Sequence, residues 1–300
     1  MSLQVFYFEF KAMGSPCHLQ FYAASVAHSE QVFDLVTRHI ALLENRYSRY
    51  LDDSLISVIN RRAGTGVKTS LDPQTFALLQ YADQCYRESG RLFDITSGVL
   101  RKIWNFKQTR VPSKAEIKEL LPLIGWQKVQ WNYHSVYLPV TGMELDFGGI
   151  VKEYAADSAA DLCRQQGICS GIIELGGDVC VIGSMPNGRG WPVAIRNPRE
   201  PEQKLLEFTL QRGGLASSGD YERYQLIDGV RYSHLLNPKT GWPVTGLQAV
   251  SVVAGQCIVA GSLATIAMLK AQSGLRWLEK LHVDYLCCQS NGQIFNSLSV

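Results

Sequence analysis

A glycine turn near the middle of the sequence constrains the fold more than any other stretch. Met143–Phe147 reads as the end of an extended segment, Gly148-Gly149 as a loop, and the apolar residues that follow recur at helical spacing up to Gly167. A strand, a glycine turn and a helix in this order let a ligand approach the glycine backbone closely, next to the free amides of the helix N-terminus. With Lys152 one turn into the helix, the pattern fits a phosphate site, although paired glycines after a strand more often mark a plain turn.

Periodicity in the rest of the chain predicts both helices and strands. We expect hairpins within Val5–Tyr22 and Tyr285–Phe295, helices over Ser29–Tyr47, Gln74–Ser89 and Cys257–Gln272, a short helix from Ser54 to Asn60, and strands at Gly171–Leu175, Trp191–Ile195 and Lys204–Leu210. The helix at Cys257–Gln272 is expected to be the last of the chain. A second glycine turn follows Leu175.

Composition excludes several classes of partner. A net charge of +2 over 300 residues offers no electrostatic case for nucleic acid or an anionic membrane surface. No run reaches the roughly 18 apolar residues of a membrane helix, and the first residues alternate like a strand rather than a signal segment. The eight cysteines lie on apolar patterns without C-x-x-C spacing, which favours buried free thiols in a reducing compartment. We therefore expect a cytoplasmic protein.

Three isolated features carry polar groups that suit a binding site, and each also has a simpler structural reading. The corner Tyr47-Ser48-Arg49-Tyr50 could be a solvated helix end. Asp94 sits between large apolar residues, where a carboxylate is more often a cap or a paired group. His234 stands at the end of a predicted strand, where a lone histidine is more often a satisfied core residue. None of the three assigns a function alone.

The order of the motifs is more specific than any single motif. The series is A-M-G-S, R-Y-S-R-Y-L-D-D-S, L-F-D-I-T, D-F-G-G-I-V-K-E-Y-A-A-D, E-L-G-G-D-V, S-S-G-D-Y-E-R-Y, Y-S-H-L-L-N-P-K-T-G-W-P-V and V-A-G-S-L-A-T. This series, from about Phe10 to the C-terminus, resembles the ApbE family of FAD:protein FMN transferases. The resemblance implies one T-fold-like α+β domain over residues 1–300, with mixed or antiparallel sheets and packed helices, in which residues 101–142 form an accessory region.

The resemblance also implies an activity and a set of site residues. The family transfers FMN from FAD to a Thr or Ser of a partner flavoprotein, releases AMP and uses Mg²⁺. The flavin and adenine contacts that it implies match Met13, Tyr47, Ser48, Arg49, Asp94, Gly148, Lys152 and Leu235. The magnesium ligands that it implies match the Gly149 carbonyl and the Thr265 hydroxyl. We expect Lys152 and the glycine amides to hold the diphosphate and His234 to accept the proton of the acceptor hydroxyl.

One departure from the family pattern bears on activity. The family's magnesium-ligand Asp aligns with Gly261, and Glu153 stands where many members have Gly. A site reduced to a carbonyl and a hydroxyl should hold Mg²⁺ weakly, since this ion is usually anchored by carboxylates. Three alternatives stay open: an active transferase in which Glu153 or Asp220 replaces the carboxylate or in which the carboxylate is not needed, an FAD-binding module that has lost transfer, and a metal-dependent FAD pyrophosphatase.

Overall fold

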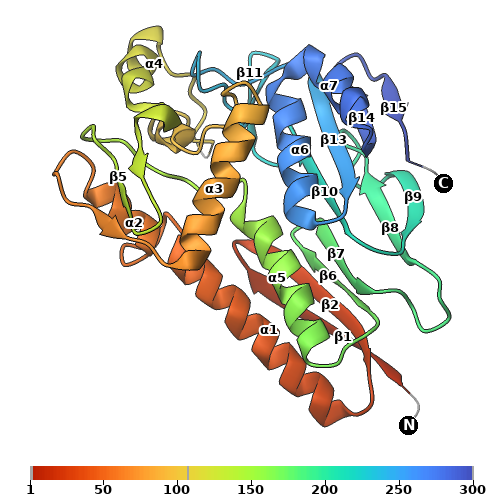
Figure 1. Ribbon diagram of the computed structural model, residues 1–300. Helices are drawn as coiled ribbons and strands as arrows, with labels where there is room; N and C mark the ends of the chain where they lie inside the picture. The colour runs from red at the N-terminus through yellow and green to blue at the C-terminus, as the bar shows by residue number, and fades with distance from the viewer. Residues whose placement is uncertain (1–2, 107, 299–300) are drawn as a thin grey trace.

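An antiparallel sheet of eight strands is the framework of the computed structural model, which describes residues 3–106 and 108–298 (Figure 1). Residues 1–2, 107 and 299–300 of the expected domain lie outside the described residues. The spatial order of the strands is β1 (Gln4–Ala12), β2 (Ser15–Ala23), β6 (Gly171–Leu175), β7 (Asp178–Gly183), β10 (Gly214–Gly219), β13 (Leu247–Ala254), β14 (Asp284–Gln289) and β15 (Ile294–Asn296). With the helices packed on it, this sheet confirms the α+β class.

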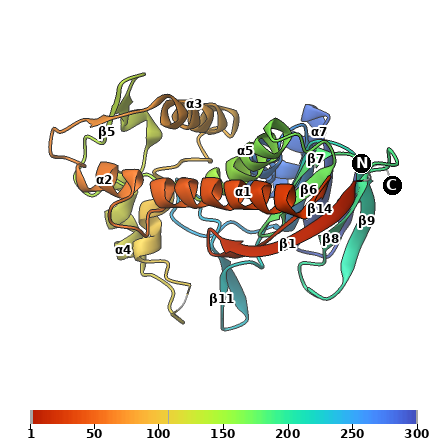
Figure 2. The same ribbon diagram turned by 90° about the horizontal axis from the view of Figure 1, so that it is seen from below.

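Helices cover one face of the sheet (Figures 1 and 2). They are α1 (Val26–Tyr47), α5 (Val151–Gln165), α6 (Cys257–Leu269) and α7 (Gly274–Leu281). In α1 the buried residues Val32, Val36, Ile40 and Leu43 recur at helical spacing, so one stripe of the helix faces the core. Helix α6 is apolar on nearly all sides because it packs against α5, α7 and the sheet.

The opposite face of the sheet carries a smaller layer. Strands β8 (Trp191–Arg196) and β9 (Lys204–Leu210) pair with each other and pack on this face. Strand β7 is buried on both sides: Val179 and Val181 face this layer, whereas Cys180 and Ile182 face the helices. This alternation follows from the two-residue period of a strand and explains why β7 reads as a continuous apolar run.

The remaining elements lie mostly at one end of the sheet (Figure 1). They are α2 (Leu55–Arg61), α3 (Pro73–Glu88), α4 (Lys114–Leu120), the small sheet of β3 (Thr69–Ser70), β5 (Ser135–Tyr137) and β4 (Gln130–Trp131), and the 3-10 turns at Ser97–Lys102, Leu121–Leu123, Trp126–Lys128 and Ala271–Ser273. A separate hairpin of β11 (Tyr224–Ile227) and β12 (Val230–Ser233) projects from the molecule (Figure 2). A small core around Trp104, Ile117 and Leu236 joins this hairpin's neighbourhood to the accessory region.

Most elements match the periodicity, and three expectations are corrected. Met143–Phe147 belongs to no strand, for a reason given below. Helix α6 is not the last helix, because α7 follows it after a short 3-10 turn. All eight cysteines are free, but Cys169 is exposed rather than buried. None of the helices in residues 3–106 and 108–298 combines the length and apolar character needed to cross a membrane.

Candidate active site around the N-terminus of helix α5

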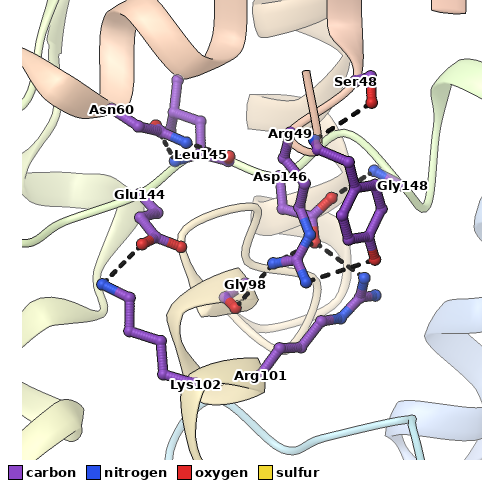
Figure 3. Close-up of polar contacts among 11 residues, drawn as sticks. Ser48, Arg49, Asn60, Gly98, Arg101, Lys102, Glu144, Leu145, Asp146 and Gly148 are labelled. Carbon is purple, nitrogen blue, oxygen red and sulfur yellow. Dashed lines mark hydrogen bonds and ion pairs between the residues drawn. The ribbon is translucent and has the colours of Figure 1, made fainter. Parts of the chain in front are cut away.

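The segment before α5 is extended but is held by side chains instead of by a sheet (Figure 3). The amide of Asn60 pairs with the backbone of Leu145 in both directions, donating from Nδ2 to the carbonyl at 3.0 Å and accepting from N–H at 2.7 Å. The N–H of Asp146 donates to the Ile95 carbonyl at 2.8 Å. Since these partners satisfy its backbone, the segment needs no neighbouring strand. This explains why Met143–Phe147 has the pattern of a strand without being one.

Asp146 lies between two arginines at the mouth of the glycine turn (Figure 3). Its Oδ2 is 3.6 Å from Nη1 of Arg49 and 3.3 Å from Nη1 of Arg101, and its Oδ1 accepts from the Gly148 N–H at 2.8 Å. Arg49 also donates to the Gly98 carbonyl at 3.2 Å. A Cβ at Gly98 would come within 2.5 Å of the Asp146 Cβ, so only glycine allows this approach. One carboxylate thus pairs with two guanidinium groups, so a net positive charge remains beside the turn.

His234, just after β12, lies near this arginine pair. Burial, and then the positive charge of Arg101, lower the pKa of His234 to about 4. The Nδ1 atom lies 3.2 Å from the Arg223 carbonyl, an acceptor, so Nδ1 carries the proton of the neutral ring. Nε2 is therefore the atom whose lone pair is available to accept a proton.

Lys152 points from the first turn of α5 toward the second glycine turn. It forms an ion pair with Asp178, the first residue of β7, and lies 3.5 Å from the Gly176 carbonyl. Burial opposes the charge of Lys152, but the carboxylates of Asp178 and Glu153 outweigh burial and raise its pKa. Asp178 is held in turn by the Ser217 N–H, which donates to Oδ1 at 3.1 Å. Lys152 is therefore a charged, fixed residue rather than a mobile surface lysine.

Glu153 packs against α6 at Gly261. It is 8% exposed, and its Oε2 atom is buried with no hydrogen-bond partner among the described residues. Burial, and then the charge of Asp178, raise the pKa of Glu153. One turn beyond Gly261, the half-buried Thr265 donates from its hydroxyl to Ser218 Oγ at 3.4 Å. No group of three or more His, Cys, Asp or Glu side chains that could hold a metal is present in the described part of the chain.

The other carboxylate considered from sequence, Asp220, is already occupied. Arg199 binds it through both guanidinium nitrogens, at 2.7 and 2.8 Å. Such a two-pronged pair is a strong, geometrically defined interaction. Asp220 is therefore the weaker candidate to replace a missing carboxylate.

The remaining predicted residues lie in or between several elements of the fold. Met13 has a positive φ of 53°, and its N–H donates to Glu44 Oε2 at 2.8 Å. Tyr47 is buried, with its hydroxyl 3.0 Å from Thr75 Oγ1. The Ser48 hydroxyl accepts from the Tyr50 N–H at 3.2 Å.

Asp94 and Leu235 are both buried. The carboxylate of Asp94 accepts from the N–H and hydroxyl of Thr96 and from the Trp126 N–H, at 2.8, 2.6 and 3.1 Å. Both its oxygens are used to hold the neighbouring loops. The Leu235 carbonyl accepts from the Val244 N–H at 2.9 Å.

Sequence reasoning missed the two residues that organise the positive side of the site. Arg101 is the first residue of the accessory region, in which the sequence predicts no site residue. Asp146 is the first residue of the D-F-G-G motif, but the sequence predicts no role for it. The signal for Asp146 was present, because an Asp side chain two residues before a glycine can accept a hydrogen bond from the free amide of that glycine. The signal for Arg101 was not, since its partner lies in a distant part of the sequence. A separate cavity of about 790 Å³ beside α3, lined by Tyr86, Arg87, Trp126, Trp131 and Lys239 among others, contains none of the predicted site residues.

Comparison with known proteins identifies the family of this chain. The profile of the ApbE family matches residues 13–287. The chain is 34% identical over 247 residues to a FAD:protein FMN transferase of Klebsiella pneumoniae, covering 80% of this chain and 75% of that protein. It is 31% identical over 278 residues to a Treponema pallidum protein of the same name, covering 84% and 75%.

Solved structures give the same result. The crystal structure of the ApbE protein from Thermotoga maritima superposes with a TM-score of 0.89 at 27% identity, covering 98% of this chain and 97% of that one. The apo flavinyl transferase ApbE of Pseudomonas stutzeri gives 0.86 at 28% identity, covering 98% and 94%. The chain therefore belongs to the ApbE family.

Proposed function

We propose that this chain transfers FMN from FAD to a Thr or Ser hydroxyl of an acceptor flavoprotein and releases AMP. The observation that carries the proposal is family membership, since relatives that match most of the chain bear the name FAD:protein FMN transferase. The acceptor is a protein partner, and neither nucleic acid nor a membrane is required. We also propose that residues 1–300 form one such domain, with 101–142 as an accessory region, and that it works in the cytoplasm.

The cations around the α5 N-terminus support binding of a diphosphate. Arg49 and Arg101 pair with Asp146 beside the turn, Lys152 lies in the first turn of α5 with its side chain toward the second glycine turn, and the amides of Gly148-Gly149 lie at the positive end of the helix dipole. An anion here gains charge-assisted hydrogen bonds from groups that are already held in place. Met13, Tyr47, Ser48, Asp94 and Leu235 are proposed to shape the pocket for the flavin and the adenosine.

His234 is proposed to take the proton of the acceptor hydroxyl at Nε2. Its ring is neutral near pH 7 because its pKa is lowered to about 4. A bound diphosphate adds negative charge that opposes the effect of Arg101 and raises this pKa toward the working pH, where a general base is most effective.

The proposed step is a substitution at phosphorus. The acceptor oxygen attacks the phosphorus on the FMN side of the diphosphate, and the bond from this phosphorus to the bridging oxygen breaks. AMP leaves with the bridging oxygen and the bonding electrons, while the hydroxyl proton moves to His234. The fixed cations stabilise charge that develops on the phosphate oxygens.

The residues near α6 fit the Mg²⁺ ion that the resemblance implies. The buried Glu153 Oε2 has no hydrogen-bond partner among the described residues, the half-buried Thr265 lies one turn after Gly261 on α6, and Gly149 lies in the turn that leads into α5, four residues before Glu153. These are oxygen ligands of the kind that magnesium prefers. When bound, the ion would supply positive charge to the diphosphate oxygens.

The departure at Gly261 separates the proposal from its alternatives. If Gly261 replaces a family Asp and no other carboxylate takes its place, the interpretation as an FAD-binding module is favoured. The Glu153 carboxylate beside Gly261, whose Oε2 has no hydrogen-bond partner among the described residues, favours an active enzyme instead.

Product analysis tests the proposal against both alternatives. The protein would be incubated with FAD, Mg²⁺ and an acceptor domain that a relative modifies, and AMP and free FMN would be quantified by chromatography. Transfer predicts AMP release that depends on the acceptor, with little free FMN. Equal amounts of AMP and FMN without acceptor would indicate a pyrophosphatase, and no AMP at all would indicate a binding module.

A further inference from the structure

Glu153 and Gly261 occupy one shared volume between α5 and α6. A Cβ added at Gly261 would come 2.6 Å from Cγ of Glu153 and 3.0 Å from its Oε1. Carbon atoms cannot approach so closely, so any side chain at position 261 would have to displace the glutamate. The carboxylate reaches across from α5 into the space that a side chain on α6 would otherwise fill.

The attraction of Lys152 compensates the charge of this carboxylate only in part, because burial and the charge of Asp178 outweigh it. Glu153 is 8% exposed, and its Oε2 has no partner among the described residues. The nearest cation, Lys152, is paired with a second buried carboxylate, Asp178. A buried charge without a partner is costly and needs an explanation, such as an ion that is part of the working site.

Further oxygen atoms lie on α6 and on the strands that pack against α5 and α6. Thr265 lies one turn after Gly261 on the same side of α6, and its hydroxyl contacts Ser218 Oγ at 3.4 Å. The next residue along the strand from Ser218, Ser217, holds Asp178 through its N–H at 3.1 Å. Helices α5 and α6 pack against each other, α5 also against β7 and α6 also against β10, so these neighbouring elements supply carboxylate and hydroxyl oxygens, which are ligands for a hard divalent cation.

We propose that Glu153 is the carboxylate ligand of the divalent cation in this chain, reaching from α5 into the space left by Gly261 on α6. Asp178 is assigned to Lys152, which it positions. The inference rests on the proposed function, because it names the residue that anchors the metal of that same reaction. The inference also implies that the carboxylate can move from position 153 to position 261 only if both residues are substituted.

Direct metal binding tests this assignment without relying on turnover. Mn²⁺ binding would be measured by electron paramagnetic resonance, with and without FAD, for the wild type and for E153Q, E153G, G261D and E153G/G261D. Because losing even an outer-shell partner of a metal costs roughly 10- to 100-fold in affinity, E153Q should lose at least about 10-fold. E153G should lose as much, and E153G/G261D should recover affinity relative to E153G. G261D alone should not gain affinity, since Glu153 already fills the space.

Two controls keep the outcome clear. D161N changes an exposed carboxylate on the same helix and should leave Mn²⁺ affinity unchanged. E153Q preserves the shape of the side chain, so the test remains valid if E153G fails to fold. Unchanged Mn²⁺ affinity in E153Q, or a wild type that binds no Mn²⁺ with FAD present, would overturn the inference. A wild type that binds Mn²⁺ through Glu153 but transfers no FMN would instead disprove the proposed function alone.

Discussion

Lys152 in the first turn of α5 forms an ion pair with Asp178 at the start of β7, which joins the two glycine turns of the sequence through their charged residues. The Asp178 side chain is 3% exposed and that of Lys152 is 27% exposed. The partly exposed lysine side chain thus extends to a buried carboxylate, and this ion pair holds it in place before any ligand binds. Preorganised charge of this kind costs little to use when a phosphate binds.

Replacing Lys152 with Ala should weaken FAD binding. A charge-assisted hydrogen bond contributes on the order of 1.5–3 kcal/mol, which corresponds to roughly 10- to 150-fold in affinity. Calorimetric titration of folded protein would measure the change. Lys114, an exposed lysine at the start of α4, is the matched control, and K114A should bind FAD like the wild type. If K152A also binds like the wild type, Lys152 does not contact the diphosphate.

The same substitution should also destabilise the fold, which the sequence did not suggest. K152A leaves the buried Asp178 carboxylate without its cation, and breaking such a pair should lower the free energy of unfolding by about 3 kcal/mol. K152A/D178N should lose less than K152A, because no unpaired charge remains. Urea denaturation of the wild type, both single variants and the double variant would give the coupling energy between Lys152 and Asp178. Strictly additive losses would show that the pair contributes no coupling energy.

The protein should bind FAD more tightly than FMN. FMN lacks the second phosphate and the adenosine, so it forfeits part of the contact with the cations around the α5 N-terminus. Losing one charge-assisted hydrogen bond should weaken binding by about 10-fold or more. Parallel calorimetric titrations would compare the two ligands. Equal affinities would mean that the diphosphate is not recognised.

Stability should depend on pH through His234. Its pKa is lowered from 6.5 to about 4, so the unfolded chain takes up this proton more readily than the folded one. The contribution of the neutral ring is therefore complete above about pH 6.5 and is lost as the pH falls toward about 4. H234Q should show a shallower loss of stability over this range than the wild type. The difference between the two proteins is the readout, because burial also lowers the pKa of His39.

A second measurement isolates the cause of this shift. In a titration followed by nuclear magnetic resonance, R101Q should raise the pKa of His234 without restoring 6.5, since burial is the larger cause. A pKa near 6.5 in the wild type would contradict the burial of the ring.

Local sequence patterns predicted the elements that depend on near neighbours. The N-terminal hairpin and α1 follow directly from alternation and helical spacing, and the turn at Met13-Gly14 has the positive φ angles that its sequence suggests. Helix α7 was missed because it begins without a side-chain cap and ends on His282 in a left-handed conformation, where glycine would be the usual signal. Such ends leave little mark in a sequence.

The site could be predicted only in part, for a related reason. The glycine turn, Lys152 and His234 were identified from motifs, but their partners come from distant elements. The contacts of Asp146 with Arg49 and Arg101 and of Glu153 with Gly261 are tertiary, so no local pattern records them. In particular, the absence of the family's Asp at Gly261 suggests, from the sequence alone, that an aspartate restored there would add a ligand. The packing of Glu153 corrects this, because an aspartate there would collide with the glutamate.

The central claim is that the chain attaches FMN covalently to a protein hydroxyl, and the intact mass of the acceptor tests it most directly. An acceptor domain that a relative modifies would be incubated with FAD, Mg²⁺ and either the wild type or H234Q, and analysed by mass spectrometry. The wild type should add one phosphoester-linked FMN, and changing the target Thr to Ala should abolish the addition. H234Q should lower the rate by about 10²- to 10⁴-fold, as expected when a general base is lost, while still binding FAD. An acceptor whose mass stays unchanged with the wild type, while FAD binds normally, would contradict the account.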